Sequence, residues 1–302
     1  YFVYLNFSNS EESVSAHRKM SWKNSKHFIY LLALIFSVHI LFQFPQFYKQ
    51  KMVGLRLLFF IFHNILALIV EFYVILIRNK KGFVKYNKDM SDLLTKFPNK
   101  YCEICDNFKP ERSHHCSKCR RCIKKMDHHC RWLNVCINND NMAYFIRFLA
   151  FGILDLILIT LFSGYNIFDM DKNYQPLFLC RIVCFLVFAQ IFVAGFLAAT
   201  VGLFFIERFS FMMKNITFLE NLALEEYSGN FGLKPEDSPY NLGIMKNLRI
   251  QLGYPFLFYL YGAQGDGITF EKRFECEEWP PYRKQARRRR HIPRANIIDQ
   301  LL

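Results

Sequence analysis

Apolar residues in this chain are gathered into four long runs instead of being spread evenly along it. The runs are Phe28–Phe47, Leu57–Ile77, Ala143–Phe162 and Ile182–Ile206. A helix of about 20 predominantly apolar residues, rising 1.5 Å per residue, is long enough to cross the hydrocarbon core of a bilayer. The pattern therefore predicts a mainly α-helical, polytopic membrane protein with four transmembrane helices.

Charged residues inside some of these runs leave one alternative to a transmembrane helix. Phe28–Phe47 contains no Asp, Glu, Lys or Arg, whereas Leu57–Ile77 contains Glu71. The third run contains Arg147 and Asp155. A buried helix of a soluble core is the alternative, and it is strongest for this third run. Acidic residues within a membrane usually face protein or water, so both acids are functional candidates.

The charges between the runs predict the orientation. Segment 78–142 carries fifteen Lys and Arg residues, whereas 163–181 has two, balanced by two acids. Since cytoplasmic loops carry an excess of Lys and Arg, segment 78–142 and both termini are expected in the cytosol. The short connection 48–56, with three basic residues, departs mildly from this rule. The net charge of +14 suits an anionic membrane surface and does not demand nucleic acid.

The expected organisation follows from these boundaries. It comprises a cytosolic arm at 1–27, transmembrane helices 1 and 2 at 28–77, a cytosolic cysteine-rich domain at 78–142, helices 3 and 4 at 143–206, and a cytosolic region at 207–302.

The C-terminal region has three local features. Asn215–Glu220 is expected to open a helix with Asn215 as its cap. Tyr254–Tyr261 is apolar but too short to span, so it lies at the membrane interface or packs inside the cytosolic region. Seven basic residues at 283–294 favour a tail attracted to lipid over a nucleic-acid patch, so no nucleic-acid partner is expected.

Segment 102–136 holds seven of the ten cysteines. The pairs Cys102 and Cys105, Cys116 and Cys119, and Cys119 and Cys122 are each separated by two residues, a spacing typical of zinc sites. Adding Cys136 and two histidines makes eight ligands, enough for two tetrahedral Zn²⁺ ions. Cys130 is then surplus. A thiol outside two filled sites, next to an Asp-His pair, is typical of a nucleophile.

The same segment resembles the DHHC palmitoyltransferases, also called protein S-acyltransferases. The resemblance is carried by Cys102, Cys105, Lys109, Pro110, Arg112, His115, Cys116, Cys119, Cys122, the run Asp127-His128-His129-Cys130, Trp132, Cys136, Asn141 and Phe145. It covers roughly 45 residues, and the family also places this domain between the second and third of four spans.

The resemblance implies a division of the zinc ligands that spacing alone leaves open. One structural Zn²⁺ takes Cys102, Cys105, His115 and Cys122, and the other takes Cys116, Cys119, His129 and Cys136. His114, although adjacent to a ligand, is expected to be a solvated or structural histidine.

The resemblance also implies a two-step, ping-pong acyl transfer. Cys130 would take a long-chain acyl group from acyl-CoA, typically palmitoyl-CoA, and pass it to a membrane-proximal cysteine of a protein substrate. His128 would act as the base, Asp127 would orient it, and the zinc ligand His129 would anchor the loop. No residue is assigned to CoA binding. The expected location is the Golgi, the endoplasmic reticulum or another endomembrane.

The sequence departs from the family pattern at several positions. Arg131 replaces the usual Pro, either as a tolerated change or to lower the Cys130 pKa or contact CoA. Val135 and Asn138 stand where Asn and Gly are common, and the Asp-Pro-Gly motif is not visible in 78–101. In the Thr-Thr-x-Glu motif, Phe218 replaces the second Thr, which is expected to support Asp127. The supporting residues that do match are Thr217, Glu220 and Asn247.

The sequence allows two roles for Asp155 and more than one class of function. Asp155 either lines or shortens an acyl cavity, or it pairs with an Arg or His of another span. The alternatives to an enzyme are a catalytically silent zinc-domain scaffold or adaptor, and a transporter or channel. The intact Asp127, His128 and Cys130 argue against the scaffold, and four spans without repeat symmetry argue against the transporter.

Overall fold

The computed structural model describes residues 53–85, 100–168, 177–231, 233–253, 262–263, 265–276 and 279. The chain divides into two compact units, 1–61 with 132–134, and 62–131 with 135–302. Of the first unit, the described residues are 53–61, which are the first turns of a helix, and the short turn 132–134. The remaining description concerns the second unit.

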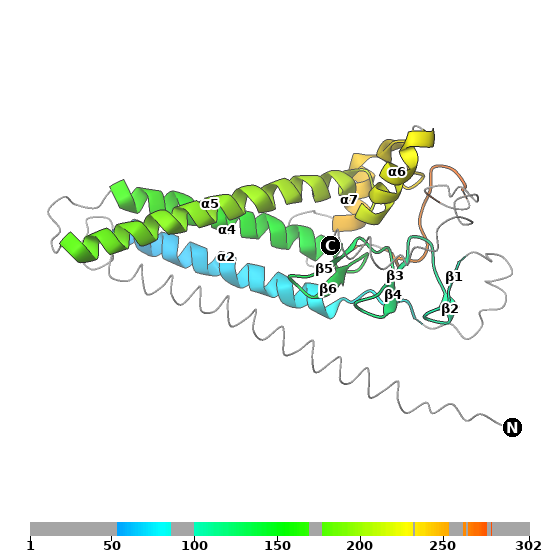
Figure 1. The fold of residues 1–302 in the computed structure, drawn as a ribbon, viewed down its shortest axis with the longest axis horizontal. Helices are drawn as coiled ribbons and strands as arrows, with labels where there is room; N and C mark the ends of the chain where they lie inside the picture. Colours follow the sequence, from blue (N-terminus) through cyan, green and yellow to red (C-terminus); the bar gives the residue numbers. More distant parts are fainter. Residues whose placement is uncertain are drawn as a thin grey trace, which may run out of the picture. The chain divides into compact units, whose positions relative to one another are not determined.

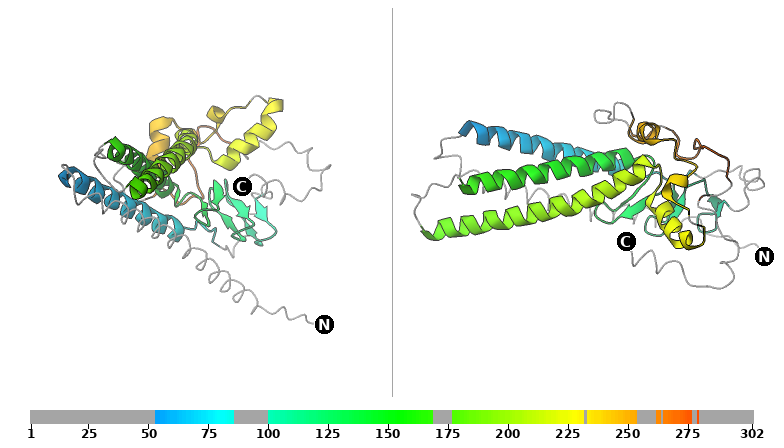
Figure 2. Two further views of the ribbon diagram at one scale, coloured as in Figure 1. Left: turned by 60° about the vertical axis from the view of Figure 1, so that its left-hand side comes forward. Right: turned by 90° about the horizontal axis from the view of Figure 1, so that it is seen from above.

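Three of the helices are long and apolar enough to cross a membrane (Figure 1). They are α2 (Val53–Asn79), α4 (Met142–Phe168) and α5 (Leu177–Met213), and their membrane-compatible stretches are Leu57–Asn79, Met142–Tyr165 and Phe185–Met213. These match the second, third and fourth predicted spans. The predicted first span, Phe28–Phe47, lies outside the described residues. In both views of Figure 2, α4 and α5 run along each other.

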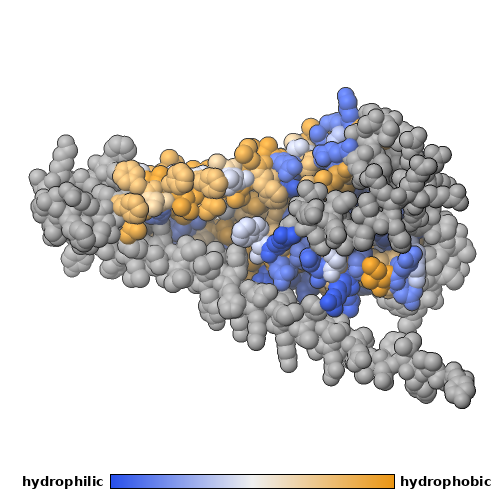
Figure 3. All heavy atoms as spheres, in the orientation of Figure 1, coloured by the Kyte–Doolittle hydropathy of each residue, from blue (hydrophilic) through white to orange (hydrophobic). Residues whose placement is uncertain are grey.

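Helix α5 continues beyond the predicted end of the fourth span at Ile206. Glu207 and Arg208 both have a high intrinsic helix propensity. The buried side chain of Arg208 contacts the carboxylate of Asp127. Figure 3 shows hydrophobic side chains along the long helices and hydrophilic ones around the hairpins that follow α2. Large apolar side chains such as Phe185, Phe192 and Leu203 are exposed, as expected for a surface that faces lipid.

Polar residues inside the apolar helices have partners there. Nδ1 of His63 in α2 lies 2.7 Å from Oδ1 of Asp155 in α4. Of the two roles considered for Asp155, the structure supports the second, because its carboxylate pairs with a histidine of another helix. Arg147 of α4 donates a hydrogen bond of 2.6 Å to the carbonyl of Leu252. The charges that weakened the prediction of the third span thus join helices to one another.

Three antiparallel hairpins lie between α2 and α4. They pair β1 (Tyr101–Cys102) with β2 (Asn107–Phe108), β3 (His114–Cys116) with β4 (Arg121–Ile123), and β5 (His128–Cys130) with β6 (Val135–Ile137). Strands of two or three residues cannot support stable isolated hairpins. Other groups must therefore hold this region together.

Three short helices follow α5, namely α6 (Phe218–Phe231), the 3-10 helix η2 (Pro235–Asp237) and α7 (Ile244–Leu252). Leu248 and Leu252 of α7 pack into a core with Ala143 and Ile146 of α4 and Met212 of α5.

The predicted cap of α6 is wrong by two residues. The Oγ1 atom of Thr217 accepts a hydrogen bond of 3.2 Å from the Glu220 amide, and the Glu220 carboxylate accepts one of 2.9 Å from the Thr217 amide. This reciprocal pair is a capping box. Asn215 instead adopts a left-handed conformation with φ 51°, which Asn tolerates, and its carboxamide contacts other segments.

Several predicted features lie outside the described residues. They are the N-terminal arm at 1–27, the aromatic run Tyr254–Tyr261 and the basic stretch 283–294.

Candidate functional site

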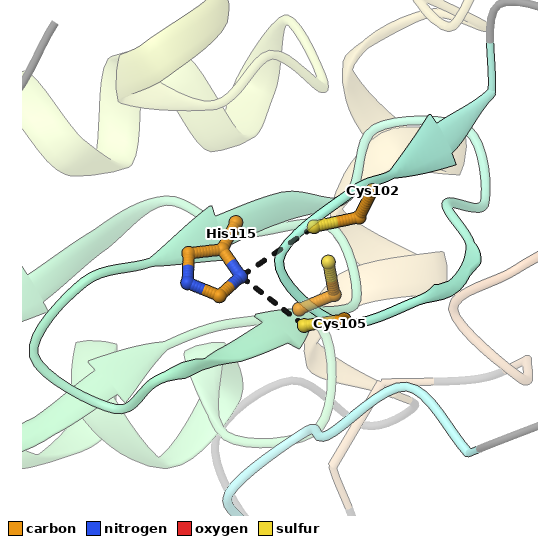
Figure 4. Close-up of side chains that lie close together, drawn as sticks. Cys102, Cys105 and His115 are labelled. Atoms are coloured by element: carbon orange, nitrogen blue, oxygen red, sulfur yellow. Dashed lines mark hydrogen bonds between the residues drawn. The ribbon is translucent and has the colours of Figure 1, made fainter. Parts of the chain in front are cut away.

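The first group of potential metal ligands combines the β1–β2 hairpin with β3 and β4. Cys102, Cys105, His115 and Cys122 offer ligand atoms that all lie within 4.8 Å of one another. Figure 4 shows the labelled Cys102, Cys105 and His115 pointing toward one another, with the two sulfurs 3.6 and 3.2 Å from Nδ1 of His115.

The second group has the same composition. The Sγ atoms of Cys116, Cys119 and Cys136 each lie 3.5 Å from Nδ1 of His129. Tetrahedral Zn²⁺ with bonds of about 2.3 Å to sulfur and about 2.0 Å to nitrogen requires a sulfur–nitrogen separation of about 3.5 Å. The two Cys3His groups therefore fit two zinc ions. They are the same two sets that the family resemblance implied, and His114 is in neither.

The interleaving of the two groups follows from strand geometry. Successive side chains on a strand point to opposite faces, so the neighbours His115 and Cys116 face different metal sites. The register places His115 opposite Cys122, its partner in the first group, and His129 opposite Cys136, its partner in the second. The β3–β4 hairpin thus contributes ligands to both sites and links them.

Backbone hydrogen bonds attach this region to the end of α2. The amide of Val84 donates to the carbonyl of Cys122 at 2.9 Å, and the amide of Lys124 donates to the carbonyl of Gly82 at 2.9 Å. Asn141, at the start of α4, donates from Nδ2 to the carbonyls of Ile77 and Lys80, at 3.3 and 2.9 Å. These bonds join the β3–β4 hairpin and the start of α4 to the last turn of α2 and the residues just after it.

Among the seven cysteines of segment 102–136, Cys130 is the one outside both groups, and it ends strand β5 next to a histidine–aspartate pair. Nδ1 of His128 lies 2.8 Å from Oδ2 of the buried Asp127. The imidazole also hydrogen-bonds the thiol of Cys130. Since Nδ1 is occupied by the carboxylate, Nε2 is the nitrogen left for the thiol. The three residues are therefore arranged as nucleophile, base and orienting acid.

Charge strengthens this arrangement. Burial lowers the pKa of His128, but the Asp127 carboxylate and the Cys130 thiol outweigh it and raise the pKa to about 9. Burial raises the pKa of Asp127, but the His128 imidazole, the Arg208 guanidinium and the Phe218 amide together hold it below its usual value. A charged Asp127 therefore favours the imidazolium form of His128 beside Cys130.

Asp127 is supported by groups that the sequence did not identify. The backbone N–H of Phe218 donates to Oδ1 at 2.8 Å, and Nη1 of Arg208 lies 3.3 Å from Oδ2. Position 218 therefore supports Asp127 through its main chain although the Thr side chain is missing. Arg208 was missed because an arginine directly after a long apolar run is an ordinary feature of a membrane interface.

The pair lies against the two long helices α4 and α5. The ring of His128 makes edge-on contacts with Phe145 of α4 and Phe204 of α5, with centroids 5.6 and 6.3 Å apart. Cys130 is only 8% exposed, whereas Arg131 is exposed. The imidazole close to the buried Cys130 thus packs against aromatic side chains of two helices able to cross a membrane.

A buried ion pair attaches the hairpins to α6. Nε and Nη2 of Arg112 donate to the two carboxylate oxygens of Glu220 at 2.6 and 2.8 Å. The guanidinium also lies over the rings of Tyr240 and Phe270, 4.0 and 5.0 Å from their centroids. Glu220, predicted to be a supporting residue, thus both closes the capping box and holds Arg112.

A second buried basic side chain joins the hairpin region to α7 and to the connection between α5 and α6. Nζ of Lys125 donates to Oδ1 of Asn215 at 3.0 Å and to Oε1 of Gln251 at 3.2 Å. Burial, reinforced by Arg112, lowers the pKa of Lys125 well below its usual range. Asn247, the third predicted supporting residue, donates from Nδ2 to the carbonyl of Met213 at 2.7 Å and so caps the end of α5.

Comparison with known proteins agrees with this geometry. A family model described as DHHC palmitoyltransferase matches residues 95–225.

Palmitoyltransferase ZDHHC15 of Homo sapiens is 30% identical over 193 residues, which are 60% of this chain and 53% of that protein. Palmitoyltransferase ZDHHC20 of Homo sapiens is 31% identical over 185 residues, 58% of this chain and 47% of that protein. Palmitoyltransferase ZDHHC2 of Mus musculus is 29% identical over 200 residues, 65% of this chain and 51% of that protein. The chain spans about half the length of these curated relatives. Residues 95–225 form a domain of the DHHC palmitoyltransferase family.

Proposed function

We propose that this protein is a protein S-palmitoyltransferase that moves a long-chain acyl group from acyl-CoA, through a thioester on Cys130, to cysteines of protein substrates at a membrane. The observation that carries the proposal is the hydrogen-bonded Asp127–His128 pair beside Cys130. Neither Cys130 nor His128 belongs to a Cys3His group, so both are free for chemistry. The names of the similar proteins support the same activity.

In the first step, His128 takes the proton of the Cys130 thiol, and the thiolate attacks the thioester carbonyl of acyl-CoA. The bond from the carbonyl carbon to the CoA sulfur breaks, and the CoA thiolate takes the proton from the imidazolium. Asp127 keeps Nδ1 of His128 protonated and stabilises the imidazolium while it exists. The product is a thioester on Cys130.

In the second step, the thiol of a substrate cysteine loses its proton to His128 and attacks the acyl-Cys130 thioester. The acyl group moves to the substrate sulfur, and the Cys130 thiolate recovers the proton. A covalent intermediate of this kind gives ping-pong kinetics.

The two zinc ions would be structural. The eight ligands fill two closed sites, which leave no coordination position for a substrate, and zinc supplies the cohesion that the short hairpins lack. His129 then has a positioning task, since its binding to zinc would anchor β5 and hold its neighbours His128 and Cys130 in place.

The membrane supplies the environment for the acyl chain. We place four transmembrane helices in the protein, with segment 78–142 and both termini on the cytosolic side of an endomembrane. Transfer of the chain into an apolar setting is favoured by about 0.8 kcal/mol per CH2 group. The contacts of His128 with Phe145 and Phe204 support a position for Cys130 where such a chain can extend along α4 and α5.

The decisive experiment is covalent labelling with an alkyne-tagged palmitoyl-CoA. Detergent-purified wild-type protein should acquire a hydroxylamine-sensitive label, and Cys130→Ser should acquire none while keeping two zinc ions per chain. Wild-type protein that holds two zinc ions but stays unlabelled would contradict the proposal and favour a silent zinc-domain scaffold.

A further inference from the structure

Arg208 lies near the C-terminal end of α5, and its side chain turns toward the hairpins. The side chain is 6% exposed, and Nη1 lies 3.3 Å from Oδ2 of Asp127. Its Nη2 atom lies 3.2 Å from Glu207. A buried guanidinium is costly unless its contacts are specific, and Nε of Arg208 has no hydrogen-bond partner within the described part of the chain. Such a costly placement calls for an explanation.

The explanation lies in the two oxygens of Asp127. Oδ1 accepts the Phe218 amide at 2.8 Å, while Oδ2 is approached by both His128 and Arg208. Without Arg208, the only side chain contacting Oδ2 among these groups would be His128. The carboxylate could then turn about its Oδ1 contact together with the imidazole, and it would no longer fix the direction of the ring. The guanidinium therefore contacts the atom whose position determines the direction of the His128 ring.

Aromatic rings hold Arg208 in this position. Its guanidinium carbon lies 4.2 Å from the centroid of Phe218, 4.7 Å from that of Phe204 and 5.5 Å from that of Phe211. Cations bind favourably over the faces of such rings. Phe204 also contacts His128 edge-on, so one ring restrains both the arginine and the imidazole.

We propose that Arg208 is a positioning residue for Asp127, held on the ring of Phe218, and that the two together replace the Thr hydroxyl expected at position 218. Phe218 contributes its backbone N–H to Oδ1 and its ring to the guanidinium, and the guanidinium supplies the donor that Oδ2 needs. The change from Thr to Phe then swaps one donor for another instead of removing support from the proposed catalytic residue. This inference rests on the proposed function.

The test uses full-length protein with single-turnover acylation of Cys130 by alkyne-tagged palmitoyl-CoA. Arg208→Gln should lower the rate at saturating acyl-CoA by about 10- to 100-fold, the effect of losing one hydrogen bond to a charged group. The acyl-CoA concentration at half-maximal rate and the zinc content should not change. Arg208→Lys should retain part of the rate. Lys246→Gln, a control that removes an exposed ion pair with Glu271 and leaves Arg208 and Asp127 unchanged, should behave as wild type.

Restoring the hydroxyl gives a sharper result. The double variant Arg208→Gln with Phe218→Thr should recover part of the lost rate, because a Thr hydroxyl can donate to Asp127. Replacing Phe218 with Leu in the same background, which keeps the backbone N–H and adds no hydroxyl, should recover nothing. A role of Arg208 in packing alone predicts no recovery in either case, with a lower Tm as the main effect of Arg208→Gln.

A second readout separates this inference from the proposed function. The rate of Cys130 alkylation by iodoacetamide, followed by peptide mass spectrometry, requires no acyl-CoA. If wild-type protein fails to acylate but Arg208→Gln slows alkylation and Phe218→Thr restores it, the palmitoyltransferase proposal fails and the positioning role stands. If Arg208→Gln changes neither the acylation nor the alkylation rate, the positioning role is wrong.

Discussion

A Cβ atom at Gly82 would overlap the side-chain carboxamide of Asn138. Gly82, just after α2, has φ 61°, a conformation that glycine adopts without strain. The space that it leaves is filled by Asn138, whose Nδ2 donates to the carbonyls of Cys136 and Lys80 at 2.8 and 3.2 Å. Asn138, which replaces the Gly common in the family, is therefore accommodated by a glycine on the facing segment.

Gly82→Ala should lower the stability of the protein by about 1–3 kcal/mol, because an added methyl group must displace a packed, hydrogen-bonded side chain. Thermal unfolding of detergent-purified protein would measure the effect. Adding Asn138→Gly should recover part of the loss. Gly265→Ala is the control, since Gly265 also has a positive φ but has open space around it. Equal shifts in Tm for both alanine variants would show that the Asn138 contact is unimportant.

Arg112→Ala should destabilise the protein by about 3–5 kcal/mol, because it leaves the carboxylate of Glu220 buried without its cation. Arg112→Lys should rescue it poorly, since an ammonium group cannot donate from two fixed positions to both oxygens. Tm would be compared with that of Lys246→Ala, which removes an exposed ion pair to Glu271 and should cost less than about 1 kcal/mol. A stable, active Arg112→Ala variant would contradict this view of the attachment.

Cys119→Ala should reduce the zinc content below two ions per chain, as measured by inductively coupled plasma mass spectrometry. Because β3 and β4 carry ligands of both groups, the loss should also loosen the first site and lower Tm. Cys276→Ala, which removes a described cysteine outside both groups, should keep two zinc ions. Retention of both ions by Cys119→Ala would exclude Cys119 as a ligand.

His63→Leu and Asp155→Leu should each destabilise the helices, because each removes one side of the polar contact between α2 and α4. The double variant should be more stable than the sum of the two changes predicts, by about 0.6 kcal/mol, the average for interhelical hydrogen bonds in membranes, and by at most about 1.7 kcal/mol. Unfolding in detergent of all four proteins completes the cycle. Additive effects would mean that the pair contributes no coupling.

Arg131→Pro should leave acylation of Cys130 intact. Arg131 is exposed, whereas His128, Asp127 and Arg208, which we propose prepare Cys130 for reaction, are all buried. Single-turnover labelling would show the outcome, with Cys130→Ser as the blank. A large loss of label with unchanged zinc content would instead give Arg131 a role in lowering the Cys130 pKa or contacting CoA.

The sequence by itself determined the features that depend on neighbouring residues. Long apolar runs located the three described helices that can cross a membrane, and the spacing of cysteines indicated eight ligands and one surplus thiol. The division of the ligands into two groups required the family resemblance. The structure gives a reason for it, since His115 and Cys116 lie on opposite faces of one strand.

Only the tertiary structure decided how the surplus thiol is supported. Asp127 and Arg208 lie 81 positions apart in the chain, and Arg112 and Glu220 lie 108 apart, so no local pattern relates them. The pairing of Asp155 with His63 and the choice of Thr217 over Asn215 as a cap depend in the same way on neighbours brought by folding. Local periodicity reports which surface a residue belongs to, but the partner of a buried polar group is set by the segment that packs against it.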